Sequence, residues 1–195
     1  LRSYDRKMPE EINRVLTDQV ADLLYTTERS AETNLVREGI DAARVRFVGN
    51  VMIDSLLHNR EFARAPGSTI ADAGFDPGMI ASSAGYGVVT LHRPSNVDHP
   101  ENLASLLGVL AEIARQLPLV FALHPRTRAN IERFGLQQLI ADPQLILLPP
   151  QGYLEMLGLM AGARIVLTDS GGLQEETTAL GVPCLTLREN TERPI

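Results

Sequence analysis

The chain has 195 residues, 44% of them apolar, which is enough to bury a core in one large domain or two small lobes. Its formal net charge of −6 argues against a nucleic-acid backbone as partner, because such binding depends on Lys and Arg contacts to phosphates. The single cysteine, Cys184, excludes a disulfide framework or a cysteine metal site within this chain. The sequence shows neither an apolar run of membrane-spanning length nor a secretory leader, so we expect a cytoplasmic protein that does not enter a membrane.

The first 50 residues predict helices over 10–20 and 28–38 and strands over 23–26 and 45–48. Pro9 fixes the start of the first helix. Four apolar residues predict its buried stripe: Ile12, Val15, Leu16 and Val20. The opposite face carries Glu10, Asn13, Arg14 and Thr17. This face is either a solvated surface with a Glu10 to Arg14 ion pair or one wall of a ligand cleft, where a carboxylate could move protons.

The rest of the chain divides into a connection and a second lobe. Residues 51–63 have a helical pattern, and residues 65–86 are rich in Gly, Pro and Ser. We therefore expect an incomplete first lobe over 1–50, an interlobe connection over 51–85 and a second lobe over 86–195. In the second lobe, strands are expected over 87–92, 119–124, 145–148, 164–168 and 183–187, and helices over 101–116, 153–161 and 172–180. This alternation predicts an α/β fold with a mostly parallel sheet.

Three strands of the second lobe end in chemically capable residues: His92, His124 and the pair Asp169-Ser170. The carboxyl ends of parallel strands share one edge, where open α/β sheets bind ligands. A lone histidine at a strand end is more often structural, but two histidines and a phosphate turn on the same edge leave a structural and a functional role equally open. Arg93 and Arg126 add cationic side chains that suit a diphosphate.

The segment 164–176 joins a buried strand to a helix through a turn suited to a phosphate. Ser170, Gly171 and Gly172 open a helix whose first amides have no partners within the helix, and glycines let an anion approach that backbone. The alternative is an ordinary helix cap, in which the side chain of Ser170 or Asp169 satisfies the first turn.

Two adjacent carboxylates follow this turn. At about 100° per residue, Leu173, Thr177 and Leu180 share the packed face of the helix. Glu176 lies beside that face, whereas Glu175 is expected to point into solvent. A carboxylate one turn past a phosphate can accept hydrogen bonds from a ribose diol, so Glu176 is the better ligand candidate. The alternative is that both carboxylates only complement the helix dipole.

Short motifs follow one another in a fixed order along the whole chain. They are Leu1-Arg-Ser3, Met8-Pro-Glu-Glu-Ile-Asn-Arg14, Val48-Gly-Asn-Val-Met-Ile-Asp54, Thr90-Leu-His-Arg93, His124-Pro125, Tyr153-Leu154, Thr168-Asp-Ser-Gly-Gly-Leu-Gln-Glu-Glu176, Gly181-Val-Pro183 and Thr191-Glu-Arg-Pro194. This set resembles the UDP-N-acetylglucosamine 2-epimerases. The resemblance implies the GT-B fold of two Rossmann-like lobes, here the end of the first lobe plus most of the second.

The resemblance also implies an isomerase that interconverts UDP-N-acetylglucosamine and UDP-N-acetylmannosamine. The family eliminates UDP to give 2-acetamidoglucal and adds it back on the other configuration at C2, without a metal or a redox cofactor. The implied catalytic residues are Glu10 and His92. The implied UDP ligands are Arg14, Met156, Ser170, Gly171 and Glu176, and Arg93 and His124 match a possible regulatory UDP-N-acetylglucosamine site. A homodimer when full length and a role in cell-envelope polysaccharide biosynthesis are further expectations.

Some features depart from the family pattern. His92-Arg-Pro-Ser-Asn96 replaces the commoner His-Arg-Arg-Glu-Asn, and Ile195 stands where many members have Glu. A hydrolysing epimerase that releases N-acetylmannosamine is therefore one alternative, and a GT-B glycosyltransferase, which would not need Glu10, is another. Because the family's other two acidic catalytic residues lie upstream of Leu1, we expect a fragment that does not epimerise its substrate by itself. A nucleotide-binding or folding module is the non-enzymatic alternative.

Overall fold

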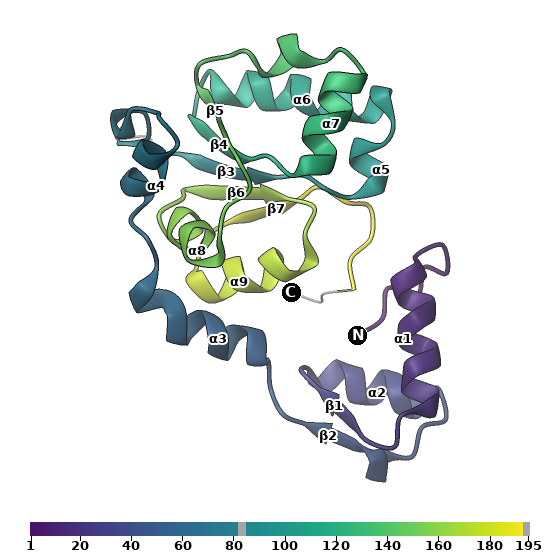
Figure 1. Ribbon diagram of the computed structural model, residues 1–195. Coiled ribbons are helices and arrows are strands. Elements are labelled where there is room, and N and C mark those ends of the chain that lie inside the picture. The colour runs from purple at the N-terminus through teal and green to yellow at the C-terminus, as the bar shows by residue number, and fades with distance from the viewer. Residues whose placement is uncertain (82–84, 193–195) are drawn as a thin grey trace. The chain divides into compact units, whose positions relative to one another are not determined.

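The computed structural model describes residues 1–81 and 85–192, which divide into two compact units (Figure 1). Unit 1 contains Leu1–Ser55 together with the segment that begins at Glu189, and unit 2 contains Leu56–Arg188. Each unit has its own parallel sheet. Ile195, the end of the Thr191 to Pro194 motif and part of the expected connection lie outside the described residues.

Unit 1 is a small α/β unit around a two-stranded sheet, in which β1 (Leu24–Thr26) pairs in parallel with β2 (Val45–Phe47). Its helices are α1 (Pro9–Val20), α2 (Arg29–Arg37), η1 (Ala42–Arg44) and the start of α3 (Val51–Asn59). The buried apolar cluster consists of Leu24, Leu35 and Ile40. The core of this unit is therefore small, and α1 contributes little to it.

Helix α1 packs through charged residues, and the predicted apolar stripe is wrong. Leu16 is 61% exposed and Val20 is 82% exposed, whereas Glu11 is only 3% exposed. Glu11, Arg14 and Asp18 follow one another at helical spacing, and each takes part in an ion pair. The inward face of α1 was misassigned because these ion pairs and the hydrogen bonds of Glu11, rather than apolar burial, hold it in this unit.

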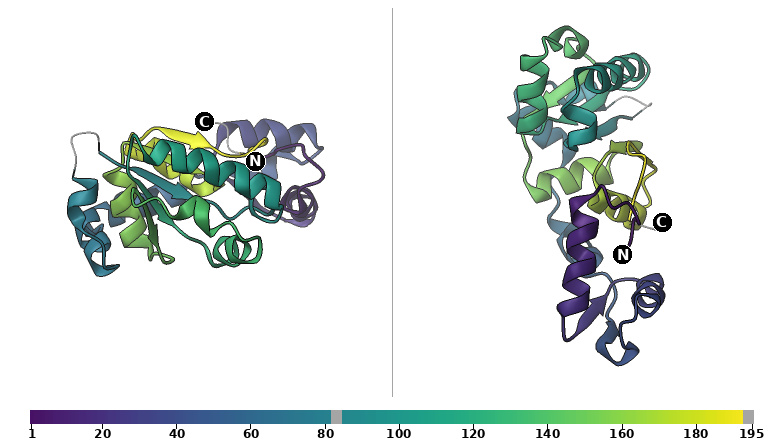
Figure 2. Two further views of the ribbon diagram at one scale, coloured as in Figure 1. Left: turned by 90° about the horizontal axis from the view of Figure 1, so that it is seen from above. Right: turned by 90° about the vertical axis from the view of Figure 1, so that its right-hand side faces the viewer.

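Unit 2 is a five-stranded parallel sheet of order β5-β4-β3-β6-β7 with helices on both faces (Figures 1 and 2). The strands are β3 (Gly87–Thr90), β4 (Leu119–Ala122), β5 (Leu145–Leu148), β6 (Ile165–Thr168) and β7 (Cys184–Thr186). The helices are η2 (Arg60–Phe62), α4 (Pro66–Asp72), η3 (Pro77–Ile80), α5 (Pro94–Val97), α6 (Pro100–Ala114), α7 (Pro125–Arg133), η4 (Gln137–Ile140), α8 (Tyr153–Ala161) and α9 (Gly171–Leu180). From β3, the chain runs outward through β4 and β5 and then returns to the other side of β3 as β6.

The two faces of this sheet carry separate apolar cores. Val88 belongs to the core that includes Val166 and Met160, and its neighbour Val89 belongs to the core that includes Phe121 and Leu107. Successive strand residues point to opposite faces, so a sheet covered on both sides needs a continuous apolar run. Strands β3, β4, β5 and β6 are therefore buried as predicted, whereas β7 is largely exposed. The carboxyl edge of the sheet is left as the place for polar chemistry.

Unit 2 contains helices that the sequence patterns did not indicate, among them those in residues 66–80 and 125–133. Residues 66–80, expected as part of a connection, include α4 and η3, and Ile70 of α4 is fully buried in the core. Helix α7 follows directly after His124, and its segment contains few apolar residues. It is held partly by polar contacts, such as the hydrogen bond from Thr127 Oγ1 to the Leu91 carbonyl at 2.5 Å. Apolar periodicity alone therefore does not reveal it.

Candidate functional site

The site lies where the strand order of unit 2 reverses, between the carboxyl ends of β3 and β6. Open parallel sheets form a crevice at such a switch point, because the loops from the two strands lead to opposite sides. The loop after β3 carries His92, and the turn after β6 carries Asp169 and Ser170. Leu187, which follows β7, belongs to the same edge through its carbonyl, which accepts from Asn96 Nδ2 at 2.7 Å.

Asp169 joins the two loops from a fully buried position. The backbone N–H of Arg93 donates to its Oδ2 at 2.8 Å, and the backbone N–H of His92 donates at 3.0 Å. Asn96 Nδ2 lies 3.1 Å from the same oxygen. His92 Nδ1 lies 2.9 Å from Oδ1. Burial opposes ionisation of this carboxyl, but the hydrogen bonds from His92 and Arg93 outweigh it and hold the pKa of Asp169 below its usual range.

The two predicted histidines come together at this edge. Their ring centroids are 5.7 Å apart with an interplanar angle of 40°. His92 is partly exposed, with 36% of its side chain accessible, and His124 is exposed. His124 Nδ1 accepts the backbone N–H of Arg126 at 3.2 Å, which caps α7. In the neutral ring its proton is therefore on Nε2, so the two imidazoles differ in their hydrogen bonding.

The turn into α9 does not use an ordinary side-chain cap. Ser170 is the N-cap residue and makes no side-chain capping hydrogen bond. The carboxylate of Asp169, the other candidate cap, accepts from the loop after β3 instead. The backbone N–H of Ser170 donates to Thr168 Oγ1 at 3.0 Å, which fixes the entry to the helix. A helix start of this kind, opened by Gly171 and Gly172, keeps its first amides available to an anion.

Both carboxylates of α9 are buried, so the prediction that Glu175 points into solvent is wrong. Glu175 is 8% exposed and Glu176 is 7% exposed. The helix contacts β6, β7 and α8, so more than one of its faces is covered, whereas the helical-wheel argument assumed one packed side. Burial, reinforced by the neighbouring charge of Glu175, raises the pKa of Glu176. A ligand hydroxyl that donates to Glu176 would relieve part of this cost.

Tyr153 extends the site toward α8 and was not assigned a role from the sequence. Burial, and after it the charge of Glu176, raises the pKa of its phenol. Met156 lies one turn further along α8, is half-buried and packs against the apolar core. The available signal was the Tyr153-Leu154 motif, three residues before the predicted uracil contact at Met156.

Two of the predicted site residues, Glu10 and Arg14, belong to unit 1. Glu10 is exposed on α1. Arg14 donates from Nη1 to Glu11 Oε2 at 3.1 Å and pairs through Nη2 with Glu192 Oε1 at 3.3 Å. Both carboxylates are buried, at 3% and 5% exposure, and sequence reasoning identified neither as an Arg14 partner. The guanidinium is therefore held in place by two anions.

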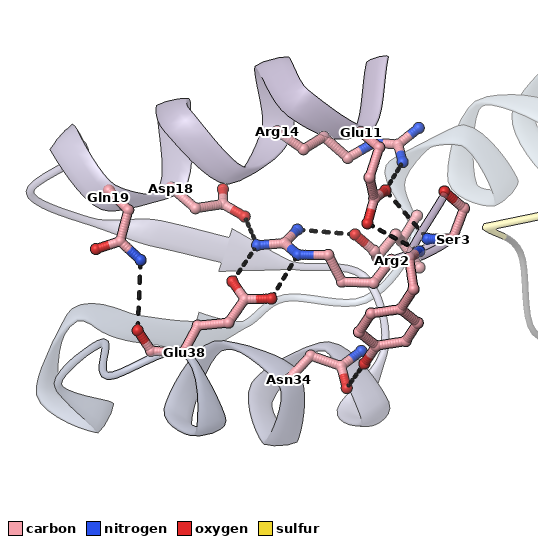
Figure 3. A network of polar contacts seen from close by, with 10 residues as sticks. Arg2, Ser3, Glu11, Arg14, Asp18, Gln19, Asn34 and Glu38 are labelled. Atoms are coloured by element: carbon pink, nitrogen blue, oxygen red, sulfur yellow. Dashed lines mark hydrogen bonds and ion pairs between the residues drawn. The ribbon is translucent and has the colours of Figure 1, made fainter. Parts of the chain in front are cut away.

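A network of mostly part-buried polar contacts anchors the segment before α1 (Figure 3). Arg2 donates to both carboxylate oxygens of Glu38 at 2.8 and 2.6 Å, and to Asp18 at 2.7 Å. Glu11 accepts the backbone N–H groups of Ser3 and Tyr4, each at 3.0 Å. Burial opposes ionisation of Glu11, but these backbone bonds outweigh it and lower its pKa. The network fixes the backbone that leads into the helix bearing Glu10 and Arg14.

Among the described residues, no group of three or more His, Cys, Asp and Glu side chains is arranged to hold a metal ion. Within the same part of the chain, no helix is both long and apolar enough to cross a membrane.

Comparisons with known proteins give consistent matches. The profile of the family described as UDP-N-acetylglucosamine 2-epimerase matches residues 1–195. The chain is 42% identical over 197 residues to the UDP-N-acetylglucosamine 2-epimerase of Methanocaldococcus jannaschii, which covers 100% of this chain and 53% of that protein. It is 46% identical over 195 residues to the UDP-2,3-diacetamido-2,3-dideoxy-D-glucuronate 2-epimerase of Pseudomonas aeruginosa, with coverage of 98% and 51%.

A solved structure shows the same architecture. The crystal structure of the M. jannaschii UDP-GlcNAc 2-epimerase in complex with UDP-GlcNAc and UDP superposes with a TM-score of 0.86 at 40% identity, covering 100% of this chain and 53% of that one. The chain thus spans about half the length of the curated relatives it matches. The predicted fold class, parallel α/β of the GT-B type, is confirmed.

Proposed function

This chain belongs to the UDP-N-acetylglucosamine 2-epimerase family, and from that premise we propose that it carries the UDP-binding part of an isomerase acting on UDP-N-acetylglucosamine. In the proposed reaction, UDP leaves the sugar to give 2-acetamidoglucal and then returns on the other configuration at C2, giving UDP-N-acetylmannosamine. Elimination and re-addition leave the oxidation state of the sugar unchanged, so the cycle needs no redox cofactor. We assign no metal to it, and place it in the cytoplasm, in cell-envelope polysaccharide synthesis.

One observation carries this proposal: an uncapped, glycine-opened helix start lies at the switch point of the sheet, on the same edge as a histidine held by a buried carboxylate. The helix amides at Ser170 and Gly171 suit a diphosphate. Glu176, one turn along, suits the ribose diol. His92 would then lie where negative charge develops as UDP departs, and it can stabilise or protonate that group.

The remaining roles are proposed from the family motifs and from local contacts. Met156 is assigned to the uracil, because it is a flexible apolar side chain on α8 near Tyr153. Arg14, held between two carboxylates, is assigned to the diphosphate, and Glu10 to proton transfer at C2. Arg93 and His124 are proposed for a second, regulatory UDP-N-acetylglucosamine site. The functional protein is proposed to be a homodimer.

A second substrate also has specific support. The Pseudomonas aeruginosa relative, at 46% identity, is named for a UDP-2,3-diacetamido-2,3-dideoxy-D-glucuronate, whereas the archaeal UDP-N-acetylglucosamine 2-epimerases are 41% and 42% identical. Both substrates carry UDP and a 2-acetamido group, so the contacts proposed for UDP serve either one. Selection would depend on groups that face C3 and C5 of the sugar.

The proposal is tested by following UDP-N-acetylglucosamine and the diacetamido substrate by NMR. The protein assayed has the length of the relatives and contains these 195 residues, with the 195-residue chain in parallel. We expect UDP-N-acetylmannosamine or the corresponding C2 epimer from the longer protein, and UDP binding without turnover from the 195 residues. Free N-acetylmannosamine would assign the hydrolysing subtype. Transfer of the sugar to an acceptor without change at C2 would assign a glycosyltransferase.

A further inference from the structure

Within the described residues, the groups that contact the Asp169 carboxylate are hydrogen-bond donors. Three of its contacts are N–H groups whose protons cannot move at ordinary pH: the backbone amides of His92 and Arg93 and the side-chain amide of Asn96. The fourth contact is His92 Nδ1, at 2.9 Å from Oδ1. Because Asp169 is fully buried and ionised, it can only accept at each of these positions. The proton between Asp169 and His92 must therefore reside on Nδ1.

We infer that Asp169 is a positioning residue that fixes His92 in the Nδ1–H form and leaves Nε2 as the ring nitrogen that exchanges a proton with the ligand. Asn96 supports this arrangement from the other side, since its Nδ2 donates both to Asp169 and to the Leu187 carbonyl at 2.7 Å. Arg93 adds a hydrogen bond from Nε to the Asp169 carbonyl at 3.3 Å. The carboxylate cannot rotate without breaking contacts to the loop after β3 and to α5.

The chemical consequence rests on the proposed function. When the C1–O bond of the UDP-sugar breaks, its electron pair stays on the β-phosphate oxygen, and protonated His92 can give that oxygen the proton on Nε2. The proton from C2 is taken by a carboxylate, assigned above to Glu10. In the return step, Nε2 takes the proton back as the phosphate attacks C1, and a carboxylic acid gives a proton to C2 on the other face of the sugar. A ring in the opposite tautomer would present an N–H where this return step needs a lone pair.

His124 serves as an internal control, because its Nδ1 accepts a hydrogen bond whereas Nδ1 of His92 donates one. Its Nδ1 accepts the amide of Arg126, so its neutral ring carries the proton on Nε2. The two imidazoles are neighbours, with ring centroids 5.7 Å apart. A difference in tautomer between them therefore reports their hydrogen-bond partners and not the general polarity of the edge.

The test is Asp169→Asn, followed by long-range proton–nitrogen NMR of the histidine rings in mildly alkaline buffer. In the native chain we expect Nδ1–H for His92 and Nε2–H for His124. The asparagine oxygen can keep the amide donors of Arg93 and Asn96, which turns its NH₂ group toward the His92 ring. Nδ1 must then accept, and the proton is expected to move to Nε2. His124 is expected to keep its tautomer in both proteins.

An Nε2–H signal for His92 in the native chain would overturn the inference, and so would an unchanged Nδ1–H signal in a folded Asp169→Asn variant. If that variant does not fold, the native spectrum decides, together with Asn96→Ala. Asn96→Ala removes the hydrogen bond from Asn96 to Asp169 but leaves the Asp169 carboxylate that accepts from His92, so His92 is expected to keep Nδ1–H. The measurement uses no substrate. Its failure would therefore leave the proposed reaction untouched, and a failed epimerase assay would leave the tautomer assignment untouched.

Discussion

Asp169 in unit 2 and Glu11 in unit 1 are both buried carboxylates that accept two backbone N–H groups from a preceding loop. Asp169 takes those of His92 and Arg93, and Glu11 takes those of Ser3 and Tyr4. Their remaining partners differ, because Asp169 faces an imidazole and Glu11 faces the guanidinium of Arg14.

Because their partners differ, Asp169 can influence the transfer of a proton, whereas Glu11 can only hold a fixed charge. An imidazole changes its protonation state near neutral pH, whereas a guanidinium stays charged. A buried carboxylate beside His92 can therefore determine which ring nitrogen carries the proton, whereas one beside Arg14 can only orient the guanidinium. This suits the proposed division of labour, in which unit 2 handles the leaving diphosphate and Arg14 supplies a constant positive charge.

Removing the two carboxylates should give the largest measurable contrast. Asp169→Ala leaves donors stranded in a fully buried place, and we expect it to lower the free energy of unfolding by about 3 to 5 kcal/mol. Glu11→Ala should cost less, about 1 to 3 kcal/mol, because Tyr4 is 67% exposed and water can reach its amide. Urea titrations followed by circular dichroism measure both. A larger loss of unfolding free energy for Glu11→Ala than for Asp169→Ala would contradict this prediction.

Acid should remove the stability that Asp169 contributes and the stability that Glu11 contributes. Because folding lowers the pKa of Asp169 and of Glu11, each contributes stability that is fully present above its ordinary pKa and is lost as the pH falls through the lowered value. Urea titrations between neutral and acidic pH check this for each alanine variant. Each variant is expected to show a weaker acid dependence than the native chain.

Glu176 should have a smaller effect on the pH dependence of stability, and in the opposite direction to Asp169 and Glu11. Folding raises its pKa, so the cost of burying its charge appears as the pH rises from the ordinary value through the raised one. If it accepts from the ribose, UDP affinity should increase over the same interval. Glu176→Gln should remove that increase and weaken binding by about 1 to 3 kcal/mol, measured by calorimetry.

Glu175→Gln is the matched control for that experiment. The charge of Glu175 raises the pKa of Glu176, so removing it should shift the pH dependence of UDP binding to lower pH without abolishing it. If Glu175→Gln lost the pH dependence of UDP binding and Glu176→Gln kept it, the ribose contact would belong to Glu175 and not to Glu176.

The two regions also differ in how far the sequence predicts them. Around Asp169, apolar strands and a Gly-Gly turn indicate the strand ends, and parallel strands bring those ends together by geometry alone. The sequence does not give the strand order, so the switch point between β3 and β6 and the contact of Asp169 with the loop after β3 required the structure. A hydrogen bond between residues 77 positions apart has no local signal.

Helices α1 and α9 were misread for related physical reasons. A helical wheel assumes that apolar residues choose the buried face, but α1 is anchored in unit 1 by Glu11 and by the pairing of Asp18 with Arg2. For α9, the wheel assumes one covered side, and the helix packs against two strands and another helix. Burial of Glu11 and Glu175 therefore could not be predicted from periodicity.

The central claim, that UDP binds at the edge formed by His92 and the start of α9, is tested most directly by titrating the nitrogen-labelled 195-residue chain with UDP. The account predicts saturable shifts of the amide signals of Ser170, Gly171 and Gly172 and of the His92 ring, with amides of α2 as the unaffected reference. Weak affinity is acceptable, provided that the shifts saturate. Saturable shifts confined to other parts of the chain, or none at Ser170 to Gly172 at saturating UDP, would contradict it.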